Sequence, residues 1–176
     1  MNDLKGVYMS KRGKKPKVGD VFAIPIDDKR YAYGQLVANG FGSDCYVTYD
    51  ITAETHPELE QIVSSPIVFR IFTLHQLIVN GIWIIIGNAS ISQKIYIPEF
   101  KVESTENKVK TWMVQSYDGT ILRPASTEEI ERLNYMESFT PNMLDNAVKA
   151  KYGVLSWKPH YNKILYNNEN DSTLNK

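Results

Sequence analysis

The chain has 176 residues, of which 43% are hydrophobic and 11% aromatic, so it can bury a sizeable core and is not disordered throughout. Its longest apolar run, residues 77–87, is interrupted by Asn80 and Gly81 and is too short to span a bilayer. The single cysteine, Cys45, excludes an intrachain disulfide and fits a reducing compartment.

The formal net charge of zero conceals an uneven distribution of charge. Residues 1–17 contain six basic residues and one acidic residue, whereas the remainder contains fourteen basic and nineteen acidic residues. Such an acidic body attracts basic partners. Because no apolar signal region follows Met1, we expect a cytoplasmic protein. We also expect a mobile basic leader over residues 1–16, a single domain over 17–160 and a polar tail over 161–176.

Strand signals come first along the chain. Residues 18–26 alternate between apolar and other side chains, and residues 30–38 follow after the turn Asp27-Asp28-Lys29. Tyr31 and Tyr33 are predicted on the outer face of this hairpin. Gly34 in the middle of the second strand indicates that another backbone approaches closely there. Residues 45–49 are predicted as a short third strand.

Two later turns predict further hairpins, since Asn-Gly and Asp-Gly supply the positive φ angles of a tight turn. Asn80-Gly81 is predicted to join strands over residues 67–79 and 82–86. The second of these strands is apolar on both faces, so we expect it, with Trp83, in the centre of the sheet. Asp118-Gly119 is predicted to join residues 111–117 to residues 120–122.

The apolar period then changes to that of helices. Ser126 and Glu129 form a capping box, and Thr140-Pro141 provides a cap and a first-turn proline before a helix that Gly153 ends. Strands first and helices last predict an α+β fold. We expect a strongly bent antiparallel β-sheet or partial barrel, with helices in the C-terminal third.

Catalytic and metal-binding patterns are weak in this sequence. The three histidines are too far apart for zinc spacing, so we expect no metal site, no cofactor and no catalytic residue. Cys45 and His75 can be imagined as nucleophile and base, but both fall in predicted apolar strands. Asp27 and Asp28 can be imagined as an acid–base pair, although adjacent residues at a hairpin tip point apart into water. We therefore expect a binding protein rather than an enzyme.

The first hairpin resembles the opening of bacterial immunity protein family 26, which begins with a Gly-Asp strand ending in Ile-Pro and an Arg-Tyr-Ala-Tyr-Gly return. Gln35 stands where that motif usually has Arg or Lys. The resemblance extends over roughly residues 17–152, and its motifs here are residues 17–26, 30–37, Gly81-Ile82-Trp83 with Ile86-Gly87, Pro98-Glu99-Phe100, Glu128-Glu129-Ile130 and residues 144–152.

This resemblance implies an immunity protein of a bacterial polymorphic-toxin or contact-dependent competition system, whose partner is a cognate toxin domain. We expect no membrane partner, because no apolar run is long enough to span a bilayer, and the sequence leaves the oligomeric state open. Our candidate toxin-binding residues are acids on turns and two tyrosines: Asp27, Asp28, Tyr31, Tyr33, Glu54, Glu58 and Glu60.

Three other interpretations remain open. The acids can simply keep the turns solvated while one tyrosine face belongs to the core. Alternatively, outward tyrosines and the basic leader can bind single-stranded nucleic acid, although the acidic body argues against that function. A small-molecule enzyme would instead require a polar pocket around Cys45 and His75.

Overall fold

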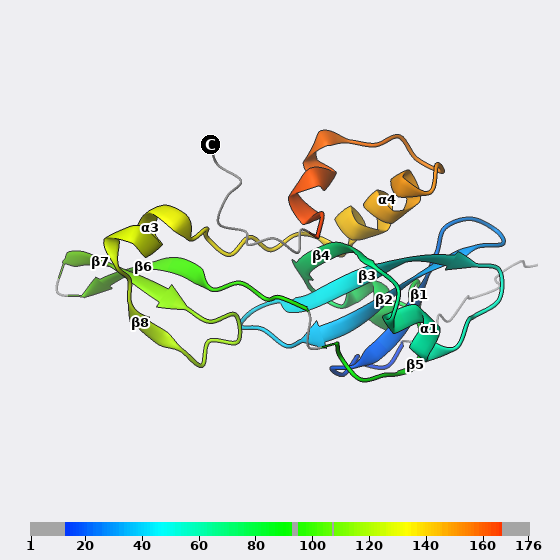
Figure 1. Ribbon diagram of the computed structural model, residues 1–176, viewed down its shortest axis with the longest axis horizontal. Coiled ribbons are helices and arrows are strands. Elements are labelled where there is room, and N and C mark those ends of the chain that lie inside the picture. Colours follow the sequence, from blue (N-terminus) through cyan, green and yellow to red (C-terminus); the bar gives the residue numbers. More distant parts are fainter. Residues whose placement is uncertain (1–12, 93–94, 107, 167–176) are drawn as a thin grey trace, which may run out of the picture.

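A computed structural model describes residues 13–92, 95–106 and 108–166 (Figure 1). The strands form two antiparallel sheets, a five-stranded sheet in the order β4-β3-β2-β1-β5 and a three-stranded sheet in the order β6-β7-β8. The strands are β1 (Asp20–Pro25), β2 (Tyr31–Ala38), β3 (Asp44–Ala53), β4 (Ile67–Thr73), β5 (Ile84–Asn88), β6 (Phe100–Glu106), β7 (Val109–Gln115) and β8 (Leu122–Pro124).

The helices are short and lie mostly in the second half of the chain. They are α1 (Leu59–Val63), α2 (Gln76–Val79), α3 (Thr127–Arg132), α4 (Pro141–Lys151) and the 3-10 helix η1 (Pro159–Ile164). Figure 1 shows α4 and η1 over one face of the five-stranded sheet and α3 beside the three-stranded sheet. This arrangement confirms the α+β class. The strands divide between two sheets, and neither sheet closes into a barrel.

The first hairpin forms as expected, with Pro25 of β1 opposite Tyr31 of β2. Gly34 has the predicted close neighbours, because a Cβ atom there would lie 2.5 Å from Phe22 Cζ and 2.7 Å from the Val47 carbonyl oxygen. No side chain fits in that space without displacing the backbone of β3 or the Phe22 ring.

Both faces of the five-stranded sheet are buried. Alternate side chains along each strand point to opposite faces, so the sheet contributes to two cores. The first core lies under α4 and η1 and includes Phe22, Ile24, Leu36, Tyr46, Phe69 and Trp83. The second core lies on the opposite face, under Ile62 of α1, and includes Val21, Ala23, Tyr33, Val37, Cys45, Val47 and Tyr49.

The expected hairpin at Asn80-Gly81 is wrong. Strand β4 ends at Thr73, the chain then forms α2, and β5 pairs with β1 at the sheet edge opposite to β4. Gly81 does have a positive φ of 71°, and its N–H donates to the Ile78 carbonyl oxygen at the end of α2. An Asn-Gly pair serves equally well at a helix C-terminus and in a hairpin turn, so the local signal was ambiguous.

Trp83 is buried as expected, although it precedes an edge strand rather than lying in a central one. Its ring stacks on Phe22 at a centroid distance of 5.1 Å, and its Nε1–H donates to Asp145 Oδ1 of α4 at 3.0 Å. Ile84, the first residue of β5, is 48% exposed, which is typical of an edge position. Trp83 therefore links β1 to α4 through the first core.

The other turns and caps lie where they were predicted, although the Thr140 side chain forms no capping hydrogen bond. Gly119 has a φ of 74° between the paired strands β7 and β8. The Ser126 side chain accepts from the Glu129 N–H while the Glu129 carboxylate accepts from the Ser126 N–H, which completes the capping box. Pro141 begins α4, and Gly153, with a φ of 80°, follows its C-cap.

The ends of the packed chain differ in how much the structure describes. Most of the expected leader, residues 1–12, lies outside the described residues, and within the remainder Pro16 is buried. At the other end, Tyr161 and Ile164 are buried in the first core, so the packing extends past the expected boundary at residue 160. Among the described residues, no helix combines the length and apolar character needed to cross a membrane.

Candidate functional site

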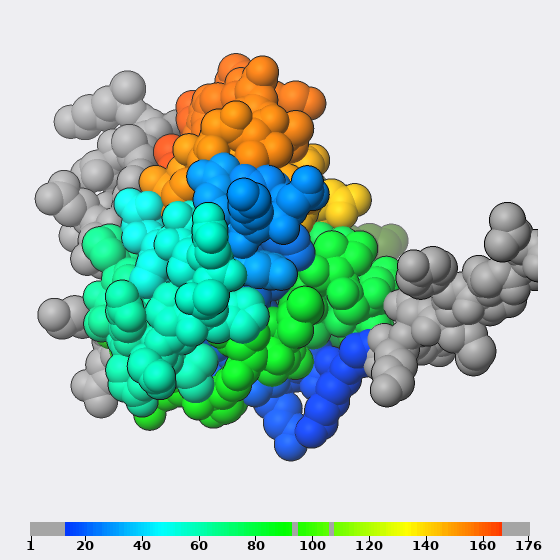
Figure 2. Space-filling model, turned by 90° about the vertical axis from the view of Figure 1, so that its right-hand side faces the viewer, coloured from blue at the N-terminus to red at the C-terminus, as the bar shows by residue number. Residues whose placement is uncertain are grey.

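Most of the acidic residues that the sequence analysis named as candidates lie at one end of the five-stranded sheet. Because Tyr31 pairs with both Pro25 and Ala53, the β1–β2 turn and the residues after β3 lie at the same end of the sheet. Figure 2 looks onto this end and shows the two segments side by side. We name as the acidic end the four exposed residues Asp28, Glu54, Glu58 and Glu60, none of which forms an ion pair among the described residues.

Asp27 has a structural role in the same turn. Its carboxylate accepts hydrogen bonds from the backbone N–H groups of Lys29 and Arg30, at 3.0 and 2.8 Å, and pairs with the Arg30 side chain at 2.7 Å. The hydrogen bond from the Arg30 side chain, together with the two backbone N–H groups, lowers the pKa of Asp27 to about 2. Asp27 therefore closes the turn, and its charge is compensated by Arg30.

The expectation of two outward tyrosines is wrong for Tyr33. That side chain is fully buried in the second core, and its hydroxyl oxygen lies 3.2 Å from His56 Nδ1. Tyr31 is half-buried, with its ring edge-on to the His56 ring at a centroid distance of 5.0 Å. The physical reason is that α1 and the residues around it cover the face that was expected to be solvated. These tyrosines do not form an open platform for stacking bases.

His56 belongs to this end of the sheet and was not foreseen. It is exposed, lies between Glu54 and Glu58 in the sequence, and packs over both tyrosines. Nothing in the local sequence distinguished it, because the contact joins residues 23 positions apart. It places an aromatic ring beside the acidic end.

The C-terminal end of α4 reaches the same region. Lys151 Nζ and the Tyr152 hydroxyl each lie 3.2 Å from Asp50 Oδ1, so the charge of Asp50 is already paired. Val154 and Leu155 follow this contact and are 43% and 42% exposed. They are apolar surface residues that the sequence analysis did not identify as candidates.

Gln35 is buried rather than presented to a partner. Its Nε2 donates to the carbonyl oxygens of Gly19 and Ala89, at 3.1 and 2.8 Å, and its Oε1 accepts from the Tyr49 hydroxyl at 2.7 Å. The carboxamide thus joins β2 to the residues flanking β1 and β5. A positive charge is not required for these contacts, because the donors serve neutral carbonyl groups.

Cys45 and His75 do not form a nucleophile and base. Cys45 is fully buried in the second core, and burial raises the pKa of its thiol to about 12, so the reactive thiolate is scarce near neutral pH. His75 instead lies near Asp44, with 3.7 Å between Nδ1 and Oδ2. Within the described part of the chain, no three potential ligand side chains are grouped as a metal site requires.

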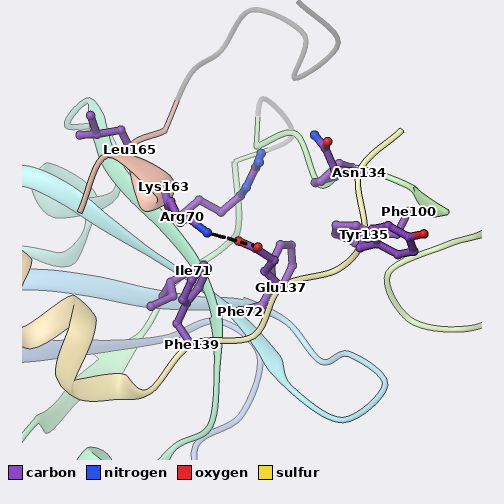
Figure 3. A pocket seen from close by; sticks show the side chains of 11 residues that line it. Arg70, Ile71, Phe72, Phe100, Asn134, Tyr135, Glu137, Phe139, Lys163 and Leu165 are labelled. Atoms are coloured by element: carbon purple, nitrogen blue, oxygen red, sulfur yellow. Dashed lines mark hydrogen bonds and ion pairs between the residues drawn. The ribbon is translucent and has the colours of Figure 1, made fainter. Parts of the chain in front are cut away.

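A cleft of about 320 Å³ lies between the two sheets (Figure 3). Its charged groups are already engaged: Lys163 Nζ lies 3.2 Å from Glu137 Oε2, and Arg70 donates to the Tyr96 carbonyl oxygen at 2.8 Å. Phe72, Phe100 and Phe139 complete much of the wall. We interpret the cleft as a structural junction between the two sheets and not as a ligand site, because Lys163 and Arg70 already bind acceptor groups of the protein itself.

Comparison with known proteins places the acidic end within a shared domain. The family model described as Immunity protein 26 matches residues 17–112, which include all of the five-stranded sheet and all four residues of the acidic end. No curated protein and no solved structure matches the chain. Since the matched residues make up more than half of its length, the chain belongs to the immunity protein 26 family.

Proposed function

We propose that this protein protects a bacterial cell by binding the toxin domain of a polymorphic-toxin system, in the cytoplasm, through direct protein–protein contact. Membership of an immunity protein family supports a protective role and a protein partner in general. The toxin domain as the partner and the surface that contacts it are our proposals.

The acidic end is the feature that supports the proposed contact with the toxin. Asp28, Glu54, Glu58 and Glu60 are exposed and form no ion pair among the described residues. Unpaired acids on turns attract a basic surface and speed its encounter, and exposed side chains lose little hydration until contact is made. We therefore propose that the toxin presents a basic surface to this end of the sheet.

The proposed mode of action is occupancy rather than chemical modification of the toxin. Catalytic inactivation would let one molecule of immunity protein silence many toxin molecules, whereas binding requires one molecule for each. Titrating a fixed amount of toxin with this protein should therefore abolish toxin activity at a one-to-one ratio. Complete inhibition at a much smaller ratio would show that a reaction is involved.

The contact surface is tested by reversing charge at two sites and comparing matched variants. Asp28→Lys with Glu54→Lys changes the acidic end, and Glu128→Lys with Glu131→Lys makes the same change in net charge on exposed residues of α3. Association with a toxin domain that this protein neutralises should slow about 10-fold for the first pair and change less than about 2-fold for the second. The first pair should also weaken the salt dependence of association.

Protection of cells that express the toxin provides the second readout. The acidic-end variant should protect less well than the α3 variant while both keep the parent's melting temperature. If the acidic-end variant binds and protects as well as the parent protein, the toxin contacts another surface.

A further inference from the structure

The two edges of the five-stranded sheet differ in whether another segment of the chain covers them. At the β4 edge, Phe69 forms a bridge with Leu165, and the Tyr166 N–H donates to the Val68 carbonyl oxygen at 2.8 Å. At the other edge β5 pairs with β1, and no described strand pairs with its outer side (Figure 1). A free strand edge offers backbone donors and acceptors to another extended chain.

The backbone of β5 directs hydrogen-bonding groups away from β1. Directly after β5, the Ala89 N–H donates to the Gly19 carbonyl oxygen at 2.9 Å, so the Asn88 carbonyl oxygen of the same peptide group points to the outer side. The Asn88 side chain is also held in place, because its Nδ2 donates to Asp20 Oδ1 at 2.9 Å. The outer edge of β5 therefore has a fixed geometry at its C-terminal end.

A cavity of about 570 Å³ lies beside this edge. Its apolar lining comes from Ile78 of α2, from Trp83, and from Ile84 and Ile85 of β5. Trp83 and Ile78 are buried in the first core, whereas Ile84 is 48% exposed, so the lining extends from the core to the solvent-exposed edge. The volume lies in the range of about 300–1,000 Å³ that is typical of ligand clefts, and it leaves room for a large apolar side chain.

The other face of β5 is already covered by α1. A Cβ atom at Gly87 would lie 2.6 Å from Leu59 Cδ1, so this helix packs directly on the strand on the side of the second core. Glu58 and Glu60 of the acidic end adjoin Leu59 in the sequence, and neither lines the cavity. A ligand at the edge of β5 therefore has open space on the cavity side only.

The cavity is bordered by positive charge. Lys14 and Lys17 line it, are exposed, and form no ion pair within the described part of the chain. Asp20 in the same lining accepts from the Lys17 N–H at 2.8 Å and from the Asn88 side chain, so both oxygen atoms of its carboxylate are engaged. Lysines can also serve only to keep an edge strand from aggregating, but that role requires no cavity beside a buried tryptophan. The two free cations favour an acidic ligand.

We propose that the free edge of β5 binds an extended, acidic segment of a partner protein. The segment adds to β5 as a further strand through backbone hydrogen bonds, one apolar side chain enters the cavity, and flanking carboxylates lie near Lys14 and Lys17. In such strand additions the backbone provides affinity, and pockets for alternate side chains provide specificity. We name as the β5 edge site the outer edge of β5, the cavity and these two lysines.

The β5 edge site does not rest on the proposed function. Asp20, beside its two lysines, and Pro25, beside the turn of the acidic end, are the first and last residues of β1. The two surfaces thus lie towards opposite ends of that strand and select partner surfaces of opposite charge. Failure of either proposal would leave the other intact.

A synthetic peptide tests the β5 edge site in the absence of toxin. The probe is acetyl-Glu-Val-Asp-Leu-Asp-Val-Glu-amide, titrated up to about 1 mM into the full chain while amide chemical shifts are recorded. We expect saturable binding, with the largest shift changes in β5 and in residues 13–17. Replacing the acids of the peptide by lysine, or its leucine by serine, should weaken binding at this site at least about 10-fold.

Backbone methylation of the peptide tests strand addition itself. Alternate N–H groups of a strand face its neighbour, so methylating the nitrogen of the leucine or of the aspartate after it removes a donor to β5 in one peptide only. We expect one of these two peptides to bind at least about 10-fold more weakly than the other. Equal binding of both would contradict the pairing with β5.

Charge reversal in the protein locates the site. Lys14→Glu with Lys17→Glu should weaken binding of the acidic peptide at least about 10-fold. Lys29→Glu with Lys158→Glu makes the same change in net charge on exposed residues elsewhere and should change binding less than about 2-fold. Both variants should keep the parent's melting temperature.

Three results would overturn the proposal. The first is no binding of the acidic peptide up to about 1 mM, and the second is equal weakening by the two pairs of substitutions. The third is slow hydrogen exchange of the outward amides of β5 in the free protein, because its own chain or a second copy would then occupy the edge.

Discussion

The two sheets of this protein differ in how completely they are covered. The five-stranded sheet is buried on both faces, and its largest side chains, such as Tyr33, Tyr46 and Tyr49, are almost inaccessible to solvent. The three-stranded sheet has α3 on one face, and residues of its other face, such as Leu122, are more than half exposed. The family match covers all of the first sheet and ends within β7 of the second.

This difference determines how much each sheet contributes to stability. A sheet buried on both faces can supply most of the apolar burial that holds the fold together, because each strand contributes to two cores. A sheet covered on one face contributes less to stability. The acidic end and the β5 edge site both belong to the stable sheet, where a rigid scaffold holds them.

The largest expected effect comes from truncating one tryptophan packed in the core of the five-stranded sheet and one that belongs to the three-stranded sheet. Trp83→Ala should lower the free energy of unfolding by about 3–5 kcal/mol, since it removes a fully buried ring and its hydrogen bond to Asp145. Trp112 is half-buried beside Tyr135, so Trp112→Ala should cost about 1 kcal/mol. Urea unfolding of both variants measures the difference. Equal losses would contradict the view that the five-stranded sheet dominates stability.

An intermediate effect is expected from the buried carboxamide between β2 and its neighbours. Gln35→Leu has a similar volume but leaves the Gly19 and Ala89 carbonyl groups and the Tyr49 hydroxyl without their partner. We expect a loss of about 1–3 kcal/mol, the usual cost of unsatisfied buried polar groups. Tyr49→Phe provides the control, because it removes one hydroxyl and should cost about 1 kcal/mol. A neutral Gln35→Leu would mean that water replaces the lost contacts.

The parts of the fold that were predictable from sequence are those with local causes. The hairpin of β1 and β2, the Asp118-Gly119 turn and the Ser126–Glu129 capping box each depend on residues a few positions apart. The pairing of β5 with β1 joins residues more than 60 positions apart, and the Asn80-Gly81 signal favoured a nearer partner. Short-range pattern cannot distinguish a helix end from a hairpin turn when both require a positive φ.

The candidate site likewise has features that were predictable from local sequence and features that were not. The acids expected on turns are exposed, because turn geometry and charge are local properties. Tyr33 was misplaced because the helix that covers its face, α1, has only five residues and left no clear periodic signal. His56 and the β5 edge site were missed because each depends on which surface another segment covers or leaves free. That information comes from the tertiary arrangement.

The smallest expected effect concerns pH and the cover of the three-stranded sheet. The hydrogen bond from the Arg123 side chain, with the Ser126 N–H, lowers the pKa of Glu129 from 4.5 to about 2. Because this folded-state pKa lies below the unfolded value, the stabilisation is fully present above about pH 4.5 and is lost as the pH falls towards 2. Arg123 joins β8 to α3 through this carboxylate, so acid should weaken the contact of α3 with the three-stranded sheet.

Hydrogen exchange, corrected for intrinsic rates, tests this expectation. Protection in α3 and in β6–β8 should fall between about pH 5 and about pH 3, before protection in β1–β4 falls. Glu129→Gln should abolish most of that pH dependence in α3, whereas Glu128→Gln removes a carboxylate from the same helix outside the Arg123 contact and should preserve it. Simultaneous loss of protection in both sheets would show that they open as one unit, and would contradict the view that the three-stranded sheet is the less stable of the two.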